Sequence, residues 1–224
     1  MKKQWVIPAK QNGEFVAKME DILAVYALPF DEDIPLVCMD EQPVQLLKDR
    51  YEGVPMKSGS AQKEDYQYIR KGTCSIFMFT APLLGYRHVD AQEHRTKIDY
   101  AHQIDYFVNV IFPDKKKFRL VQDNLNTHTL GALYEAFPPE KARSIAERLE
   151  FHFTPKHGSW LNIAEIELSA LTKQCLNRRI GDLEVLRTEI GAWEKTRNDS
   201  QKSVDWHFTT DDARGKLKSL YPKV

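Results

Sequence analysis

Apolar residues near the start of the chain recur at the spacing of an amphipathic helix. Between positions 14 and 27 they return every three or four residues, which is the helical period. These residues are Phe15, Met19, Ile22, Leu23 and Tyr26. A polar connector, LPFDEDIP, follows them. The pattern predicts a helix that docks on the domain beginning after the connector.

Five later stretches have strand character, because they are short, apolar and rich in β-branched and aromatic residues. They are residues 36–47, 73–80, 86–89, 118–122 and 151–154. Pro43 interrupts the first of them. Between the third and fourth strands, residues 96–111 return to helical spacing, and Thr96 is a suitable N-cap.

Three further helices are expected after the fourth strand. The first is capped by Asn126 or Thr127 and ends before Pro138 and Pro139, which cannot continue it. The second covers residues 140–148, and the third follows a loop after the fifth strand. The order is β-β-β-α-β-α-β-α, with one helix inserted before the last strand. It predicts an α/β protein of ribonuclease H-like fold, with a mixed five-stranded sheet flanked by helices.

The same pattern divides the chain into three parts. Residues 1–34 form a linker with the docking helix, residues 35–180 form the ribonuclease H-like domain, and residues 181–224 form a helical extension of that domain. In the extension, Thr209 and Asp212 have the spacing of a capping box for a last helix.

Composition agrees with a globular domain. The chain has 224 residues, of which 42% are hydrophobic, enough for a core. No apolar run approaches the ~20 residues that cross a bilayer, and the start, MKKQWVIPAKQNG, lacks the apolar core of a secretion signal. We therefore expect a cytoplasmic protein. Cys38, Cys74 and Cys175 are odd in number and far apart, which predicts reduced core thiols.

Charge alone does not indicate nucleic-acid binding. The 32 basic residues balance the 32 acidic residues, whereas a DNA-binding module usually has a positive excess. Any DNA affinity must come from local clusters, each of which is by itself typical of a solvated face. The candidate clusters are Lys115, Lys116, Lys117 and Arg119; Lys156, His157, Lys173, Arg178 and Arg179; and Arg214, Lys216 and Lys218.

Two acidic residues end apolar strand-like runs. Asp40 closes LVCMD, and Asp123 closes FRLVQD. Taken singly, Asp40 fits a strand-end acid that faces water, and Asp123 fits a turn residue beside Asn124, just before a helix start whose free amides favour anions. Two such endings on neighbouring strands are harder to explain in this way, because a carboxylate at the end of a buried run needs water or a partner.

A third acid lies early in the helix of HGSWLNIAEIELSAL. Asn162 and Glu165 have the spacing of a capping box, in which the glutamate would only return to the cap amide. Helical geometry does not choose between Glu165 and Glu167. An apolar stripe that contains Leu161 and Leu168 runs along the helix, and the two glutamates lie on its opposite edges. Spacing therefore leaves the third acid open.

Three converging carboxylates would favour a divalent cation. Without a cation they would raise one another's pKa, whereas hard oxygen ligands suit Mg²⁺ or Mn²⁺. A pair of such ions can activate an attacking hydroxyl and stabilise the leaving oxygen in phosphodiester cleavage or transfer. The spacing of His88, His94 and His102 matches no usual zinc site.

Six sequence pieces carry a resemblance to a known family. They are VCMDEQP, RKGTCSIFMF, HRTKIDYA, LVQDNLNTHT, HFTPKHGSWLNIAEIELSALTKQCLNRRI and VDWHFTTDDARGKLKSLYP. With them the chain resembles the catalytic domain of DDE transposases of the bacterial insertion-sequence 630 group, in the mariner-like superfamily. The resemblance implies that Asp40, Asp123 and Glu165 are the catalytic, metal-binding triad; it selects Glu165 through the family's N-x-x-E pattern.

The resemblance also implies a function. The family cuts the ends of its own mobile element and joins the freed 3′ hydroxyl to target DNA, typically at TA, using Mg²⁺ with Mn²⁺ as a substitute. The implied partners are double-stranded DNA, a second copy of the chain and a separate helix-turn-helix polypeptide, and the implied location is the nucleoid. Candidate residues for positioning DNA or water are Asn124, His128, Trp160 and Asn162, with packing as the alternative role for Trp160.

Two departures from the family leave other functions open. The chain offers no helix-turn-helix module before its docking helix, and the interval between Asp123 and Glu165 is longer than in the mariner branch. The main alternative is a catalytically silent, transposase-derived DNA-binding or regulatory remnant. A second alternative is a structure-selective nuclease of the same fold. The intact set of three acids favours an active enzyme.

Overall fold

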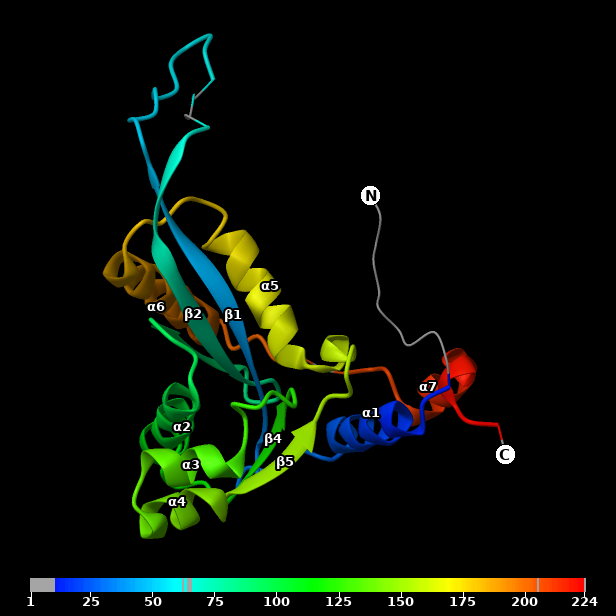
Figure 1. Ribbon diagram of the computed structural model, residues 1–224. Helices are drawn as coiled ribbons and strands as arrows, with labels where there is room; N and C mark the ends of the chain where they lie inside the picture. Colours follow the sequence, from blue (N-terminus) through cyan, green and yellow to red (C-terminus); the bar gives the residue numbers. More distant parts are fainter. Residues whose placement is uncertain (1–10, 62, 64–65, 205, 224) are drawn as a thin grey trace.

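A mixed five-stranded sheet forms the centre of the molecule (Figure 1). The computed structural model describes residues 11–61, 63, 66–204 and 206–223. The strand order is β3-β2-β1-β4-β5, with β1–β2 and β2–β3 antiparallel and β1–β4 and β4–β5 parallel. The strands are β1 Leu36–Asp49, β2 Tyr68–Ala81, β3 Tyr86–Gln92, β4 Phe118–Gln122 and β5 Leu149–Phe153. The predicted mixed sheet is confirmed.

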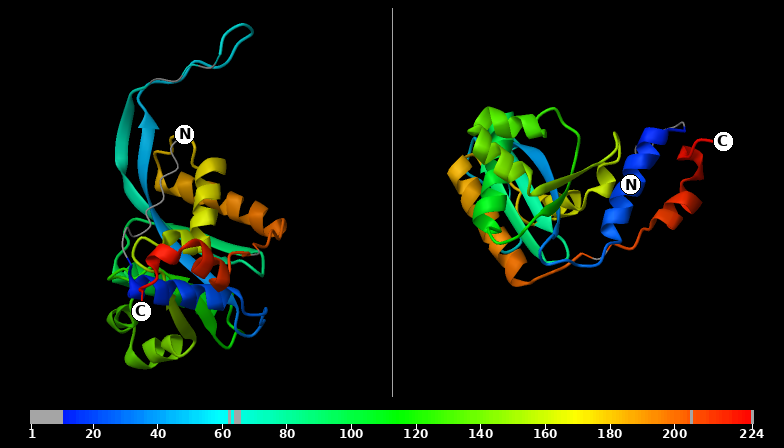
Figure 2. Two further views of the ribbon diagram at one scale, coloured as in Figure 1. Left: turned by 90° about the vertical axis from the view of Figure 1, so that its right-hand side faces the viewer. Right: turned by 90° about the horizontal axis from the view of Figure 1, so that it is seen from below.

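Strands β1 and β2 continue far beyond their neighbours as a long hairpin (Figures 1 and 2). The predicted interruption at Pro43 is wrong, because β1 runs through it to Asp49. Strand β4 pairs only with the first residues of β1, up to Cys38. Past that point β1 has one pairing partner instead of two, and a strand with a free side tolerates a proline whose missing amide is not needed for pairing.

Helices cover both faces of the sheet. They are α1 Gly13–Tyr26, α2 Lys97–Tyr106, α3 Leu130–Ala136, α4 Pro139–Ala146, α5 Ile163–Gln174, α6 Leu183–Asp199 and α7 Thr210–Lys216. One core lies under α1, α5 and α6, and a second core lies under α2, α3 and α4. The strands supply the two cores alternately: Cys38 faces the first, while Val37 and Met39 face the second.

Helix α1 docks on the domain as its apolar stripe predicts. All five of the predicted stripe residues are buried. The Tyr26 hydroxyl donates a 2.6 Å hydrogen bond to the carbonyl of Leu161, just before α5. Helix α7 lies beside α1 (Figure 2), where Arg214 binds Glu20 through two 2.9 Å contacts. The predicted capping box of Thr209 and Asp212 is present at the start of α7.

Two helix boundaries differ from the sequence prediction. The helix capped by Thr96 ends at Tyr106 and continues as a π-helical turn, Phe107–Ile111. The predicted helix start at Asn126 or Thr127 is wrong, because α3 begins at Leu130. The intervening loop is held by a turn in which the amide of His128 donates to Leu125, and by the buried side chain of His128.

The cysteines agree with the prediction of free thiols. Cys38 and Cys74 are buried, Cys175 is partly buried, and none forms a disulfide. Among the described residues, no helix combines the length and the apolar character that crossing a membrane requires.

Candidate active site

The parallel pairing of β1 and β4 brings the first two acids to one edge of the sheet. The register runs from Leu36 opposite Arg119 to Cys38 opposite Val121. Extending it by two residues aligns Asp40 with Asp123, and neighbouring strands lie about 4.8 Å apart. Asp40 is buried, whereas the Asp123 side chain is 31% exposed. The two carboxylates therefore differ in their access to water.

Asn162 attaches the start of α5 to the same edge. Its side-chain amide donates to Asp40 Oδ2 at 3.1 Å and to the Met39 carbonyl at 2.8 Å. Its oxygen accepts from the amide of Ala164 at 3.1 Å and so caps the helix. Glu165 lies in the first turn of α5 and is exposed. The Asn162 side chain thus fixes the helix start that carries Glu165 beside Asp40.

Neighbouring carboxylates affect the protonation of Asp40 and Glu165. Burial, followed by the charges of Glu165 and Asp123, raises the pKa of Asp40 to about 7, although the amide of Glu41 and the charge of His128 oppose the shift. Although the residue as a whole is exposed, partial burial of the Glu165 carboxylate and the charge of Asp123 raise its pKa, against the effect of the Ser159 side chain. Such mutual repulsion is expected where carboxylates share a site and no cation balances them.

This donor set fits a divalent cation of the Mg²⁺ type, which prefers carboxylate oxygens. Within the described part of the chain, no three His, Cys, Asp or Glu side chains form a ready-made metal cluster. Asp40, Asp123 and Glu165 therefore stay predicted ligands, and the structural support for them is their common edge and their electrostatic interaction.

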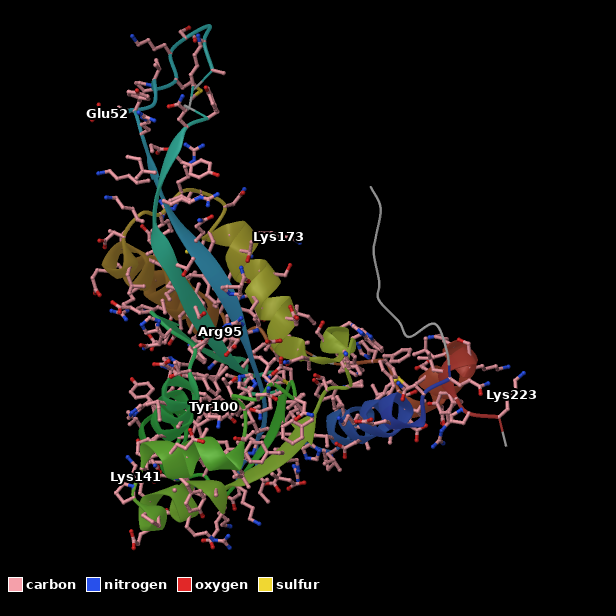
Figure 3. The ribbon with its side chains drawn as sticks, in the orientation of Figure 1. Glu52, Arg95, Tyr100, Lys141, Lys173 and Lys223 are labelled. Atoms are coloured by element: carbon pink, nitrogen blue, oxygen red, sulfur yellow. The ribbon has the colours of Figure 1, made fainter. Side chains whose placement is uncertain are left out.

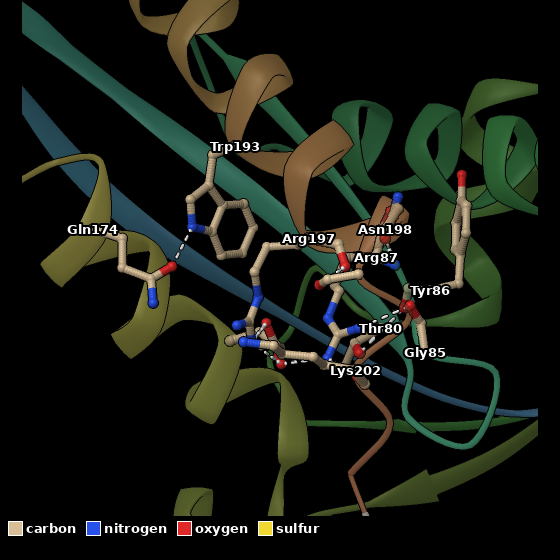
Figure 4. Close-up of polar contacts among 11 residues, drawn as sticks. Thr80, Gly85, Tyr86, Arg87, Gln174, Trp193, Arg197, Asn198 and Lys202 are labelled. Carbon is tan, nitrogen blue, oxygen red and sulfur yellow. Dashed lines mark hydrogen bonds and ion pairs between the residues drawn. The ribbon is translucent and has the colours of Figure 1, made fainter.

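The structure separates Glu165 from Glu167, which helical spacing left open. Glu167 is fully buried and binds Arg87 at 2.8 Å and Arg197 at 2.9 Å. Figure 4 labels the two arginines. Burial alone would raise the pKa of Glu167, but the hydrogen bonds and charges of both arginines lower it. Glu167 is thus an internal ion-pair residue that fixes α5 to β3 and α6.

His128 lies behind Asp123 and not at the surface, where a residue that positions DNA or water would lie. It is 1% exposed, so it does not reach water or a phosphate directly. Its Nδ1 lies 2.6 Å from Asp123 Oδ1, its Nε2 lies 3.3 Å from Glu41 Oε2, and its ring stacks on Tyr100. Burial alone would lower the pKa of His128, but the two carboxylates raise it to about 9. At neutral pH a charged His128 therefore holds Asp123.

Several polar residues behind the acids escape the sequence analysis. The Glu41 amide donates to Asp40 Oδ1 at 2.8 Å, and its carboxylate also meets Arg95 at 3.3 Å. The Tyr100 hydroxyl donates to Gln122, which in turn donates to the His128 carbonyl. Figure 3 labels Arg95, which lies just before the N-cap of α2, and Tyr100, which lies within α2. The sequence does carry a signal for part of this network. Glu41 follows Asp40 in MDEQ and Gln122 precedes Asp123 in VQDN, so each strand-end acid has a polar neighbour at the end of an apolar run.

The remaining predicted positioning residues line hollows on either side of the acids. Asn124 is exposed and lines a cavity of about 690 Å³ together with Asp123, Lys156 and His157. Trp160 is partly buried and packs edge-on against Phe208, with 5.9 Å between ring centroids. Trp160 also lines a groove that contains Glu165. Trp160 therefore packs against Phe208 and also lines the open groove.

Acidic neighbours pair with half of the residues in the predicted basic clusters. Ion pairs join Lys115 to Glu32, Lys116 to Asp33, Arg178 to Glu189, Arg179 to Asp49, Arg214 to Glu20 and Lys216 to Asp212. Over the ranges that the structure describes, Lys156 and Lys173 have no ion pair. Lys156 lies in the loop before α5 and Lys173 on α5 itself. Unbalanced positive charge thus lies on both sides of the candidate site.

A mixed five-stranded sheet in this order, with helices on both faces, defines a ribonuclease H-like domain. Residues 35–187 match the family model described as DDE superfamily endonuclease. The chain belongs to this family. No curated protein matches the chain.

Solved structures of Mos1 transposase share the fold. The Mos1 mariner paired end complex with Mn has a TM-score of 0.63 at 13% identity, covering 100% of this chain and 68% of that one. The Mos1 Strand Transfer Complex has a TM-score of 0.66 at 13% identity, covering 99% and 66%. The Mos1 transposase catalytic domain with Raltegravir and Mn has a TM-score of 0.57 at 10% identity, covering 97% and 100%. At these identities the likeness establishes the fold.

Proposed function

We propose that the chain is the catalytic part of a DDE transposase of the insertion-sequence 630 group, which cleaves DNA at transposon ends and joins them to target DNA. The proposal is supported by the β1–β4 register, which brings Asp40 and Asp123 to one sheet edge, by the contact of Asn162 with Asp40, and by the effect of Glu165 and Asp123 on the pKa of Asp40. The family match supports it. The Mos1 complexes, which hold transposon-end DNA and Mn or Mg, also support it.

The residues of this chain would divide the work as follows. Asp40, Asp123 and Glu165 would hold Mg²⁺, or Mn²⁺ as its substitute, and these ions supply activation of the attacking hydroxyl and stabilisation of the leaving oxygen. Asn162 orients Asp40, and His128 orients Asp123. Glu165 is exposed and would face the incoming DNA strand. Lys156 and Lys173 would attract the phosphates on either side.

The wider assembly belongs to the same proposal. Its target would be double-stranded DNA at TA sites, and two copies of the chain would act together to pair two transposon ends. A separate helix-turn-helix polypeptide would recognise the ends. The protein would act in the cytoplasm, on the nucleoid.

The test is metal-dependent nicking of a plasmid that carries the element's ends. We expect Mg²⁺ or Mn²⁺ to support nicking, and Asp123→Ala to abolish it while the protein stays folded. Asp114→Ala is the matched control, because Asp114 is exposed and lies outside the site. Calorimetric titration with Mn²⁺ checks the ligands separately: unchanged heats in the Asp40→Ala, Asp123→Ala and Glu165→Ala variants would refute the site. Metal binding without any cleavage, with the DNA-binding polypeptide supplied, would favour the silent remnant.

A further inference from the structure

Tyr26, the last residue of α1, is buried where α1 meets the sheet and α5. Its side chain is 9% exposed. Its ring packs on Trp206, in the segment before α7, with 5.1 Å between ring centroids. Its hydroxyl contacts β1 and the residues that begin α5. A buried tyrosine hydroxyl needs hydrogen-bond partners, and here they come from elements that also carry the predicted ligands.

The hydroxyl uses both its proton and its oxygen. It donates to the Leu161 carbonyl at 2.6 Å, and the Ile163 amide donates to its oxygen at 3.4 Å. The Cys38 sulfur lies 3.4 Å from the same oxygen. A phenol has one proton to donate, so the Cys38 thiol is the donor in that contact. Burial raises the pKa of Tyr26 well above its usual range, so the hydroxyl keeps its proton at neutral pH.

The partners of the hydroxyl lie next to two of the predicted ligands. Cys38 lies two residues before Asp40 on β1, and Ile163 lies two residues before Glu165 on α5. One atom of α1 therefore contacts both elements whose separation sets the distance between the two carboxylates. Mg²⁺ demands near-ideal octahedral geometry with ligands at about 2.0–2.1 Å, so a small change in that separation changes its affinity.

We propose that Tyr26 is a positioning residue of the metal site, whose hydroxyl fixes the start of α5 against the end of β1 and thereby Glu165 against Asp40. The inference rests on the proposed function and adds a condition to it, because the site is then complete only while α1 is docked. Without the hydroxyl, the Leu161 carbonyl and the Ile163 amide lose their partner, and the start of α5 is free to move from β1.

The test removes this hydroxyl and leaves the aromatic ring in place. Tyr26→Phe retains the packing on Trp206. Tyr221→Phe is the matched control, because the Tyr221 hydroxyl also binds α1, at 2.8 Å from Glu20, but does not contact the elements that carry the acids. Calorimetry gives the Mn²⁺ affinity of each variant without DNA. Hydrogen exchange read by NMR gives the protection of single amides in the metal-free protein.

We expect Tyr26→Phe to weaken Mn²⁺ binding roughly tenfold or more, the effect typical of a contact that orients a metal ligand. The same substitution in a Glu165→Gln background should change the affinity by less than about twofold, because the position of α5 no longer matters once its acid is removed. The Ile163 amide should exchange faster in Tyr26→Phe, whereas amides of α6 should be unaffected, which shows that the variant is folded. Tyr221→Phe should change none of these quantities.

Three results would overturn the proposal. They are an unchanged Mn²⁺ affinity in Tyr26→Phe, an equal loss with and without the Glu165 carboxylate, and an unchanged exchange rate of the Ile163 amide. The second result would mean that Tyr26 only stabilises the fold, since a general loss of stability does not depend on which ligand is present.

The outcome is separable from that of the proposed function. A protein that binds Mn²⁺ and nicks DNA equally well as Tyr26→Phe and unmodified would retain the proposed function and lose the role of Tyr26. A protein that shows the expected losses of Mn²⁺ affinity but nicks no DNA would retain the role of Tyr26 and lose the transposase activity. Absence of Mn²⁺ binding by the unmodified protein would overturn both.

Discussion

Glu165 and Glu167 lie two residues apart on one helix, yet the structure predicts opposite effects of removing their charges. Glu167→Gln leaves Arg87 and Arg197 without their carboxylate. Arg87 is fully buried, and its other acceptors, the carbonyls of Gly85 and Lys202, carry no net charge. Removing one partner of a buried ion pair costs about 3 to 5 kcal/mol, and because these carbonyls still accept from Arg87, we expect a loss of about 3 kcal/mol.

Glu165→Gln is the matched comparison. In the unmodified protein, burial and the charge of Asp123 raise the pKa of Glu165, so the ionised carboxylate destabilises the folded chain when no metal is bound. We expect this variant to be as stable as the unmodified protein or slightly more stable, and inactive. The same helix, charge change and side-chain volume are involved in both variants.

Urea unfolding followed by tryptophan fluorescence measures both effects. Trp193 is a suitable reporter, because it packs against Arg197 and donates to Gln174 on α5 (Figure 4). The m-value should stay constant, so that the midpoint reports stability. A loss below about 1 kcal/mol in Glu167→Gln, or an equal loss in Glu165→Gln, would refute the assignment of structural and functional roles to the two residues.

Two further predictions concern protonation behind and within the site. His128→Ala should lower the unfolding free energy by about 1 to 3 kcal/mol, because the buried Glu41 loses one of its two charged partners and keeps only Arg95. The variant should also abolish nicking, because Asp123 is no longer held. Since the pKa of His128 is raised from 6.5 to about 9, its stabilisation should be full below pH 6.5 and disappear as pH rises through 9; equal unfolding profiles of variant and parent across that range would contradict this. The pKa of Asp40 is raised from 3.8 to about 7, so without divalent ions stability should fall as pH rises between these values. Asp40→Asn should remove that fall, and Mn²⁺ should raise the melting temperature more above pH 7 than below it; a Mn²⁺ shift independent of pH would contradict the coupling.

Local patterns predicted the elements well, because each element satisfies its own periodicity. The stripe of α1, the five strands, the inserted helix and the last capping box are all present. The three-part division of the chain stays a prediction. The helix start at Asn126 or Thr127 failed because these residues lie in a loop fixed by the contact of His128 with Asp123 and Glu41, and capping propensity does not include such a contact.

The site depends on contacts between residues far apart in the sequence, and local sequence patterns do not identify such contacts. Arg87 lies 80 residues before Glu167 and Arg197 lies 30 residues after it, so spacing within the helix could not tell which glutamate is buried. The register of β1 and β4 is also a long-range property. The sequence carries Asp40 and Asp123 as strand-end acids, but only the pairing of Cys38 with Val121 aligns them.

The arrangement explains why an electrostatically unfavourable cluster can persist in a stable fold. Asp40 and Glu165 are destabilised by burial and by neighbouring charge, and such a cluster would relax if its supports were mobile. The supports are instead fixed: Glu167 holds α5 through Arg87 and Arg197, Asn162 holds the helix start on β1, and His128 holds Asp123. The repulsion is therefore retained in the folded chain, and a bound cation would relieve it. Affinity for the cation should accordingly depend on these supports as much as on the three acids themselves.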